Sequence, residues 1–215
     1  MEGVPDEIAD RPVPLWDHER EAIHEITEGD PLGILGLRNS LRAVVLRGLW
    51  QWGAEKELLQ GVLALVWEHD YREILASFHR REQRAMFEAA RFTVDHLPKR
   101  ITIYRGVAVE ATEQPSCSGI SWTLRRDVAC SFAVHFPGSG GSAMFPILAD
   151  FKPHLLSATV NRERVAAHLH GRDEDEIIVF GLSAKTVSVA SDEHDIREGA
   201  ARESESRREV SGADE

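Results

Sequence analysis

The sequence predicts an α+β protein of two folded parts, because the pattern of apolar residues changes sharply along the 215-residue chain. Over residues 16–97 the apolar side chains recur at helical spacing, which predicts a bundle of four helices. After Pro98 the apolar runs are short, β-branched and separated by turns, which predicts a compact, mostly antiparallel domain over 99–190. The two ends are charged and poor in apolar residues, so we expect an irregular lead-in at 1–15 and a disordered acidic tail at 191–215.

Composition narrows the class of protein. Hydrophobic residues make up 42% of the chain and charged residues 28%, which is enough apolar material for a core. No run of about 18 apolar residues occurs and the N-terminus lacks the basic-then-apolar order of a signal peptide, so we expect a cytoplasmic protein with no membrane partner. The net charge of −11 comes from the two ends, so it neither supports nor excludes a nucleic-acid target for the middle of the chain.

Glycine and proline punctuate the predicted helices of the first part. A stop and restart falls between Gly29 and Pro31, Gly53 separates two strongly apolar segments, and Pro98 closes the last one. The predicted helices are 17–28, 32–50, 54–69 and 71–96.

The second part alternates short strands with two helices. The predicted strands are 101–107, 119–123, 143–151, 176–181 and 186–190. The predicted helices are 124–136 and 161–170, where apolar residues return to helical spacing.

Arg105 stands inside the first of these strands. The charge of an arginine cannot be removed and needs a partner when it is buried. Gly106, directly behind it, has no side chain and lets another backbone or a ligand come close. A guanidinium beside an open backbone position suits a phosphate or carboxylate ligand. The alternative is an exposed arginine on an edge strand, and residues 101–107 taken alone favour that alternative.

Two further motifs follow Arg105. Ser121 and Thr123 lie on one face of a short strand just before a predicted helix, and Thr123 fits the simpler role of a helix N-cap. Glu174 and Glu176 enter a strongly apolar strand and would share a face if that segment is extended. An acidic run on a solvated loop is the simpler interpretation, but a carboxylate pair can also stabilise a cation and move a proton.

The order of these motifs resembles the mono-ADP-ribosyltransferase superfamily, specifically its Arg–Ser–Glu class. That class has an arginine on an early strand, a Ser-Thr-Ser motif before a helix and a Glu/Gln-x-Glu motif at the start of a late strand. The resemblance covers about residues 100–190, and it departs from the family where Trp122 replaces the middle threonine and Thr123 replaces the second serine. It implies that the second part folds as a compact, split β-sandwich.

The resemblance also implies a catalytic set. Arg105 would grip the pyrophosphate or nearby ribose of NAD, and Ser121 would orient Glu176. Glu176 would stabilise the cationic ribose that forms as nicotinamide leaves. Glu174 would orient or deprotonate the acceptor.

Binding of NAD, the implied substrate, would use residues around the same motifs. Arg105, Ser121 and Thr123 would contact the dinucleotide, and Gly106 would leave room for nicotinamide. Trp122 or Phe132 would stack on nicotinamide, although Phe132 lies on the apolar stripe of its predicted helix and fits a core position better. No metal is expected, since the two cysteines form no framework and the pair His168 and His170 lacks partner ligands at metal spacing.

Two functions remain open from the sequence. The first is an intracellular ADP-ribosyltransferase that modifies a protein or nucleic acid, in the manner of a toxin or phage-related effector, with an antitoxin as a further partner. The second is a non-catalytic module that keeps the fold and binds a partner protein through its helical half.

Overall fold

A computed structural model describes the chain over these residues: 15–110, 113–135, 151–190 and 192–212. Two compact units are present, Met1–Phe92 and Thr93–Glu215, so the boundary falls a few residues before the predicted one. Within the described residues, no helix combines the length and the apolar character that crossing a bilayer requires. The predicted lead-in lies outside the described residues, apart from Leu15.

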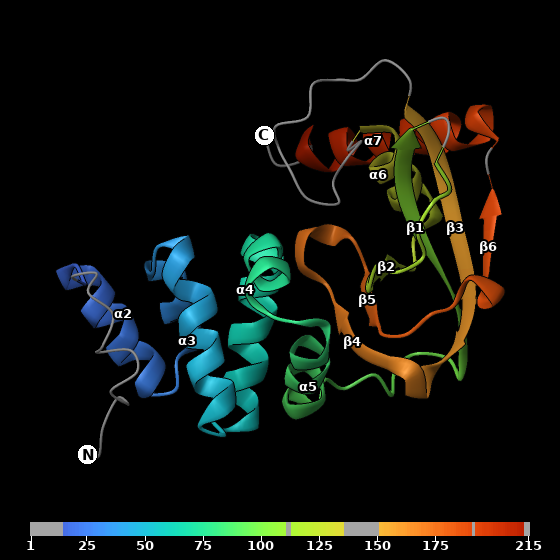
Figure 1. Cartoon of the computed structure of the whole chain (residues 1–215). Helices are drawn as coiled ribbons and strands as arrows, with labels where there is room; N and C mark the ends of the chain where they lie inside the picture. The colour runs from blue at the N-terminus through green and yellow to red at the C-terminus, as the bar shows by residue number, and fades with distance from the viewer. Residues whose placement is uncertain (1–14, 111–112, 136–150, 191, 213–215) are drawn as a thin grey trace. The chain divides into compact units, whose positions relative to one another are not determined.

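The first unit is helical, as predicted, but its segments are divided differently. Its elements are α2 (Asp17–Thr27), η1 (Pro31–Gly36), α3 (Asn39–Gln51), α4 (Lys56–Ser77) and α5 (Arg80–Ala90) (Figure 1). The predicted helix 32–50 begins as a 3₁₀ turn, because the Asp30 side chain accepts a hydrogen bond from the Leu32 N–H and Pro31 starts the turn. The predicted segment 71–96 is not one helix, since α4 passes through a kink at Asp70 and α5 is separate.

Arginines on α3 and at its N-cap reach carboxylates on three other helices. The pairs, with N–O distances of 2.5, 2.5 and 2.6 Å, are Arg38–Glu19 of α2, Arg42–Asp70 of α4 and Arg47–Glu82 of α5. Such pairs are directional, so they fix the orientation of each helix relative to α3 more than they add net stability. Sequence periodicity gave no signal for them.

Glu19 is the most deeply buried of these carboxylates, with its side chain 0% exposed. It accepts hydrogen bonds from Arg38 Nε at 2.6 Å and from the Trp16 backbone N–H at 3.0 Å. Mainly through the hydrogen bonds from Arg38, the pKa of Glu19 falls from 4.5 to about 2.

Glu19→Gln is expected to lower the melting temperature at neutral pH and to flatten the loss of stability in acid. The folded-state pKa of Glu19 is depressed, so its stabilisation is present above pH 4.5 and is lost as the pH falls toward about 2. Thermal melts at neutral pH and at about pH 3 measure this, with the exposed Glu21→Gln as the matched control. An acid profile of Glu19→Gln identical to that of wild type would contradict the role of the pair.

In the described residues of the second unit, six strands form an antiparallel sheet in the order β4-β5-β2-β1-β3-β6. Its strands are β1 (Arg100–Glu110), β2 (Ser121–Thr123), β3 (Phe151–Asn161), β4 (Val165–Leu169), β5 (Glu176–Val179) and β6 (Val187–Ala190). Its helices are α6 (Arg126–His135) and α7 (Glu193–Gly212), with 3₁₀ turns η2 (Arg162–Arg164), η3 (Gly171–Asp173) and η4 (Ala184–Thr186). The predicted α+β class and antiparallel sheet are confirmed.

One predicted element of this unit differs from the structure, and another lies almost wholly outside the described residues. The helix predicted over 161–170 is wrong: the chain makes the short turn η2 and then strand β4, whose side chains alternate between buried and half-buried. Pairing with β5 decides the outcome there, because the short apolar run fits a strand as well as a helix. The strand predicted over 143–151 lies outside the described residues except at Phe151, where β3 begins.

The prediction of a disordered tail is also wrong over the described residues 192–212, because α7 packs along α6. Ile196 and Ala200 are buried against Ala129 and Cys130, and burial raises the pKa of the Cys130 thiol. At Gly199 a Cβ would lie 2.8 Å from the Cys130 sulfur, so the glycine lets the helices approach closely. Ion pairs also hold α7 in place: Arg126–Asp195, Arg202–Asp127 and Arg125–Glu203.

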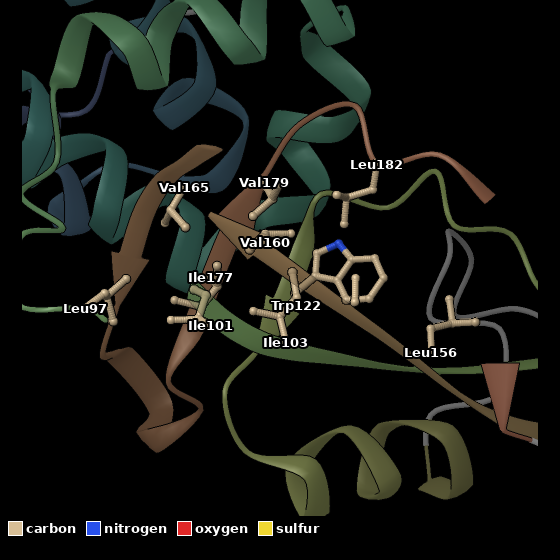
Figure 2. Packing of buried hydrophobic residues seen from close by; sticks show 11 residues of the cluster. Leu97, Ile101, Ile103, Trp122, Leu156, Val160, Val165, Ile177, Val179 and Leu182 are labelled. Carbon is tan, nitrogen blue, oxygen red and sulfur yellow. The ribbon is translucent and has the colours of Figure 1, made fainter. Parts of the chain in front are cut away.

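The sheet has two halves, β4-β5-β2 and β1-β3-β6, which meet between β2 and β1. A hydrophobic cluster joins these two halves (Figure 2). Side chains from β1 and β3 pack with side chains from β2, β4 and β5 around Trp122. The labelled members are Leu97, Ile101, Ile103, Trp122, Leu156, Val160, Val165, Ile177, Val179 and Leu182. The opposite face of the β1–β3 pair is covered by α6 and α7. Both halves of the sheet therefore share one hydrophobic core, although β1 and β2 share only one register pair.

Candidate functional site

Ser121 and Glu176 come together through the register of β2 and β5. Thr123 pairs with Glu176 and Ser121 pairs with Ile178. Since paired residues share a face and side chains alternate, Ser121 and Glu176 lie on one face and Trp122 on the other. The Ser121 hydroxyl donates a hydrogen bond to Glu176 Oε1, and Glu176 is only 7% exposed. A buried carboxylate is thus held by a neighbouring hydroxyl.

Arg105 reaches the same serine from β1. Strands β1 and β2 share one register pair, Tyr104 with Thr123, and beyond it the Arg105 Nη1 donates to the Ser121 carbonyl oxygen at 2.6 Å. A side chain therefore takes the place that a backbone N–H of β1 would fill in a continuous ladder. Ser121 connects the other two residues, accepting from Arg105 through its carbonyl and donating to Glu176 through its hydroxyl.

The exposed edge-strand interpretation of Arg105 does not hold. Strand β1 has β2 on one side and β3 on the other, and the Arg105 side chain is half-buried. Gly119 makes room for it, because a Cβ at this position would lie 2.2 Å from the guanidinium carbon. Sequence reasoning missed Gly119, although a glycine just before the Ser-x-Thr motif was a usable signal.

Gly106 serves a different purpose from the one predicted. A Cβ at Gly106 would lie 1.8 Å from the Ala129 carbonyl oxygen and 2.6 Å from the Ala133 nitrogen, both on the backbone of α6. The backbone that approaches this glycine is a helix of the same unit. The predicted role of leaving room for nicotinamide is therefore not supported, since α6 fills the space beside Gly106.

Trp122 and Thr123 are structural residues and not the predicted ligand contacts. The Trp122 ring is 2% exposed inside the shared core, and its Nε1 donates to the Gly119 carbonyl at 3.1 Å. The Thr123 hydroxyl donates to the Glu174 carbonyl at 2.5 Å and accepts from the Arg125 N–H at 2.9 Å. Burial of Trp122 and Thr123 leaves Arg105 and Ser121 as the remaining predicted NAD contacts.

The loop that carries Glu174 is sharply folded. Asp173 and Asp175 have positive φ angles of 53° and 45°, and Glu174 between them is helical in conformation. The premise of an extended segment at Glu174 is therefore wrong. Besides the bond from Thr123, the loop accepts a hydrogen bond from the Leu124 N–H to the Asp175 carbonyl at 3.1 Å. Positive φ at two non-glycine residues is costly and needs such anchoring.

A cluster of three histidines lies at the other end of this loop. His96 Nε2 is 2.8 Å from His168 Nδ1, and nitrogens of His96, His168 and His170 all lie within 4.8 Å of one another. The sequence-based statement that His168 and His170 lack a partner is wrong, because His96 supplies one from 72 residues away. Burial, followed by the neighbouring histidines, lowers the pKa of His168 and favours its neutral form.

Comparison of the chain with protein-family models, curated proteins and solved structures finds no match.

Proposed function

We propose that the chain is an NAD-dependent mono-ADP-ribosyltransferase with its reaction centre at Ser121 and Glu176. One observation carries the proposal: Ser121 accepts a hydrogen bond from Arg105 and donates one to Glu176. This supports the Arg–Ser–Glu interpretation of the sequence, because hydrogen bonds join three residues from separate strands.

The proposed reaction starts at the bond between ribose C1′ and nicotinamide. Nicotinamide leaves with the bonding electron pair as a neutral ring, and positive charge develops on the ribose. Glu176, preorganised by Ser121, stabilises that charge electrostatically. An acceptor nucleophile then forms a bond to C1′ and gives up its proton.

Glu174 is the proposed partner of the acceptor. Glu174 lies in the loop two residues before Glu176, where β5 begins, and is 8% exposed. In this role it would orient the incoming group and take its proton. The acceptor class is a protein or a nucleic acid, as in a toxin or phage-related effector, and an antitoxin would be the matching protein partner.

A nicotinamide-release assay tests the proposal directly. Purified protein is incubated with NAD, and free nicotinamide is measured over time. The expected result is release above the uncatalysed rate, with ADP-ribose on protein or RNA detected by mass spectrometry after expression in cells. Absence of both NAD binding and release would overturn the proposal and favour a non-catalytic module that binds a partner through its helical half.

Arg105→Lys is expected to weaken NAD binding by about 10- to 100-fold, as loss of a charged hydrogen bond costs about 1.5–3 kcal/mol. A lysine is a point charge and cannot both hold the Ser121 carbonyl and present a planar fork to a phosphate. Titration calorimetry with NAD measures the affinity. The exposed Arg100→Lys at the start of the same strand is the matched control. Unchanged affinity in Arg105→Lys would remove Arg105 from the binding site.

A further inference from the structure

We propose that His96, His168 and His170 form a binding site for one divalent transition-metal ion of the zinc type. The proposal stands whether or not the chain is a transferase. It uses none of the residues assigned to NAD, and its test does not need catalysis.

Geometry is the first support. The three histidines come from different segments: His96 precedes β1, His168 lies in β4, and His170 follows β4. Their ligand nitrogens converge within 4.8 Å. Zinc–nitrogen bonds of about 2.0–2.1 Å in a tetrahedral site place ligand nitrogens about 3.3 Å apart. The observed 2.8 Å between His96 Nε2 and His168 Nδ1 therefore needs to open by only about half an ångström.

Asp175 supplies the outer contacts that metal-binding histidines have. Its Oδ1 lies 3.5 Å from His168 Nε2 and 3.4 Å from His170 Nδ1. A carboxylate that faces one ring nitrogen fixes the tautomer and leaves the other nitrogen to bind the metal. His168 has the orientation that this arrangement needs, since Nε2 faces Asp175 and Nδ1 faces His96, and a small approach of Asp175 would complete the hydrogen bond.

Burial of His168 is the second support. Its side chain is 5% exposed, and its Nε2 makes no hydrogen bond within normal distance. The His168 and His170 rings lie 4.1 Å apart between centroids, so these two side chains already lie side by side. The packing of these rings therefore already brings the ligand nitrogens together in the folded chain.

The donor atoms indicate the kind of metal. Imidazole nitrogens suit Zn²⁺, Cu²⁺, Ni²⁺ and Co²⁺, whereas Mg²⁺ and Ca²⁺ require oxygen ligands. Three histidines leave a fourth tetrahedral position for water. A bound ion would also fix Asp175 and, through it, the loop between Glu174 and Glu176.

Metal binding is measured on the tag-free, full-length protein after its metal has been stripped with a chelator. Calorimetry with zinc is expected to give one ion per chain, and zinc at about 100 times its Kd is expected to raise the melting temperature by about 5–10 °C. Magnesium at the same concentration is expected to change nothing. Binding of no zinc, or of magnesium equally well, would overturn the proposal.

Single substitutions assign the ligands. His168→Ala, His96→Ala and His170→Ala are each expected to weaken zinc binding at least about tenfold, while the exposed His24→Ala of α2 leaves it unchanged. His170 is 66% exposed, so His170→Ala keeps the test decisive even where His168→Ala fails to fold. Zinc affinity that survives in both His96→Ala and His170→Ala would overturn the three-histidine site.

Discussion

Glu176→Gln is expected to slow nicotinamide release from NAD by about 10²- to 10³-fold, the usual cost of losing one preorganised electrostatic contact in a transition state. The amide keeps the shape of the side chain and still accepts the hydrogen bond of Ser121, but it carries no charge to stabilise the ribosyl cation. NAD affinity is expected to stay within a few-fold of wild type, because Arg105 is unchanged. Steady-state assay of release, together with calorimetry for NAD, separates the two effects.

Glu163→Gln is the matched control for this substitution. Glu163 is exposed on the turn η2 and has no place in the site, so its variant should release nicotinamide at the wild-type rate. Equal rates for Glu176→Gln and wild type would exclude the proposed role of Glu176 even if NAD still binds.

Gly106→Ala is expected to destabilise the second unit by about 3 kcal/mol, the upper end of what overpacking costs. The new methyl group would meet the Ala129 carbonyl oxygen at 1.8 Å and the Ala133 nitrogen at 2.6 Å. Both atoms belong to the backbone of α6, so no side-chain rotation relieves the clash and the helix must move off β1. Urea unfolding of the full chain measures the change.

Thr102→Ala serves as the control on the same strand. Thr102 is exposed on β1, and its truncation should cost less than about 1 kcal/mol. A Gly106→Ala variant that unfolds like wild type but no longer binds NAD would contradict the packing argument and restore the ligand-approach role predicted from the sequence.

Local sequence patterns predicted where single helices and strands form better than they predicted which elements pair or pack together. The strand at 101–107 and the helix at 124–136 appear as β1 and α6, because β-branched alternation and helical spacing act within one segment. Most of the segment 161–170 forms strand β4 instead of the predicted helix, because it pairs with β5. Such pairing is a tertiary effect that a single short window does not contain.

At the candidate site too, the sequence indicated single residues but not the contacts between distant segments. Arg105, Ser121 and Glu176 could be named from their residue types and order. The hydrogen bond from Arg105 to the Ser121 carbonyl could not be predicted, since a backbone acceptor has no sequence signature. His96 was missed because its partner His168 is 72 residues away and no local spacing links them. The core position of Trp122 was missed because the other residues of its cluster come from distant strands.

The packing of α7 on α6 limits how the chain can be trimmed. The charged composition of α7 makes it an obvious segment to delete when the chain is shortened. Its removal would expose the apolar surface of Ala129 and Cys130 to water. The deletion would also remove Glu203, the buried ion-pair partner of Arg125, whose side chain is 1% exposed. Arg125 also donates a hydrogen bond to the Asp173 carbonyl, so the loss of Glu203 would affect the residue that anchors this loop. Inactivity of a deletion variant that ends near residue 190 would therefore be explained by the lost packing on α6, without any binding role of the deleted segment.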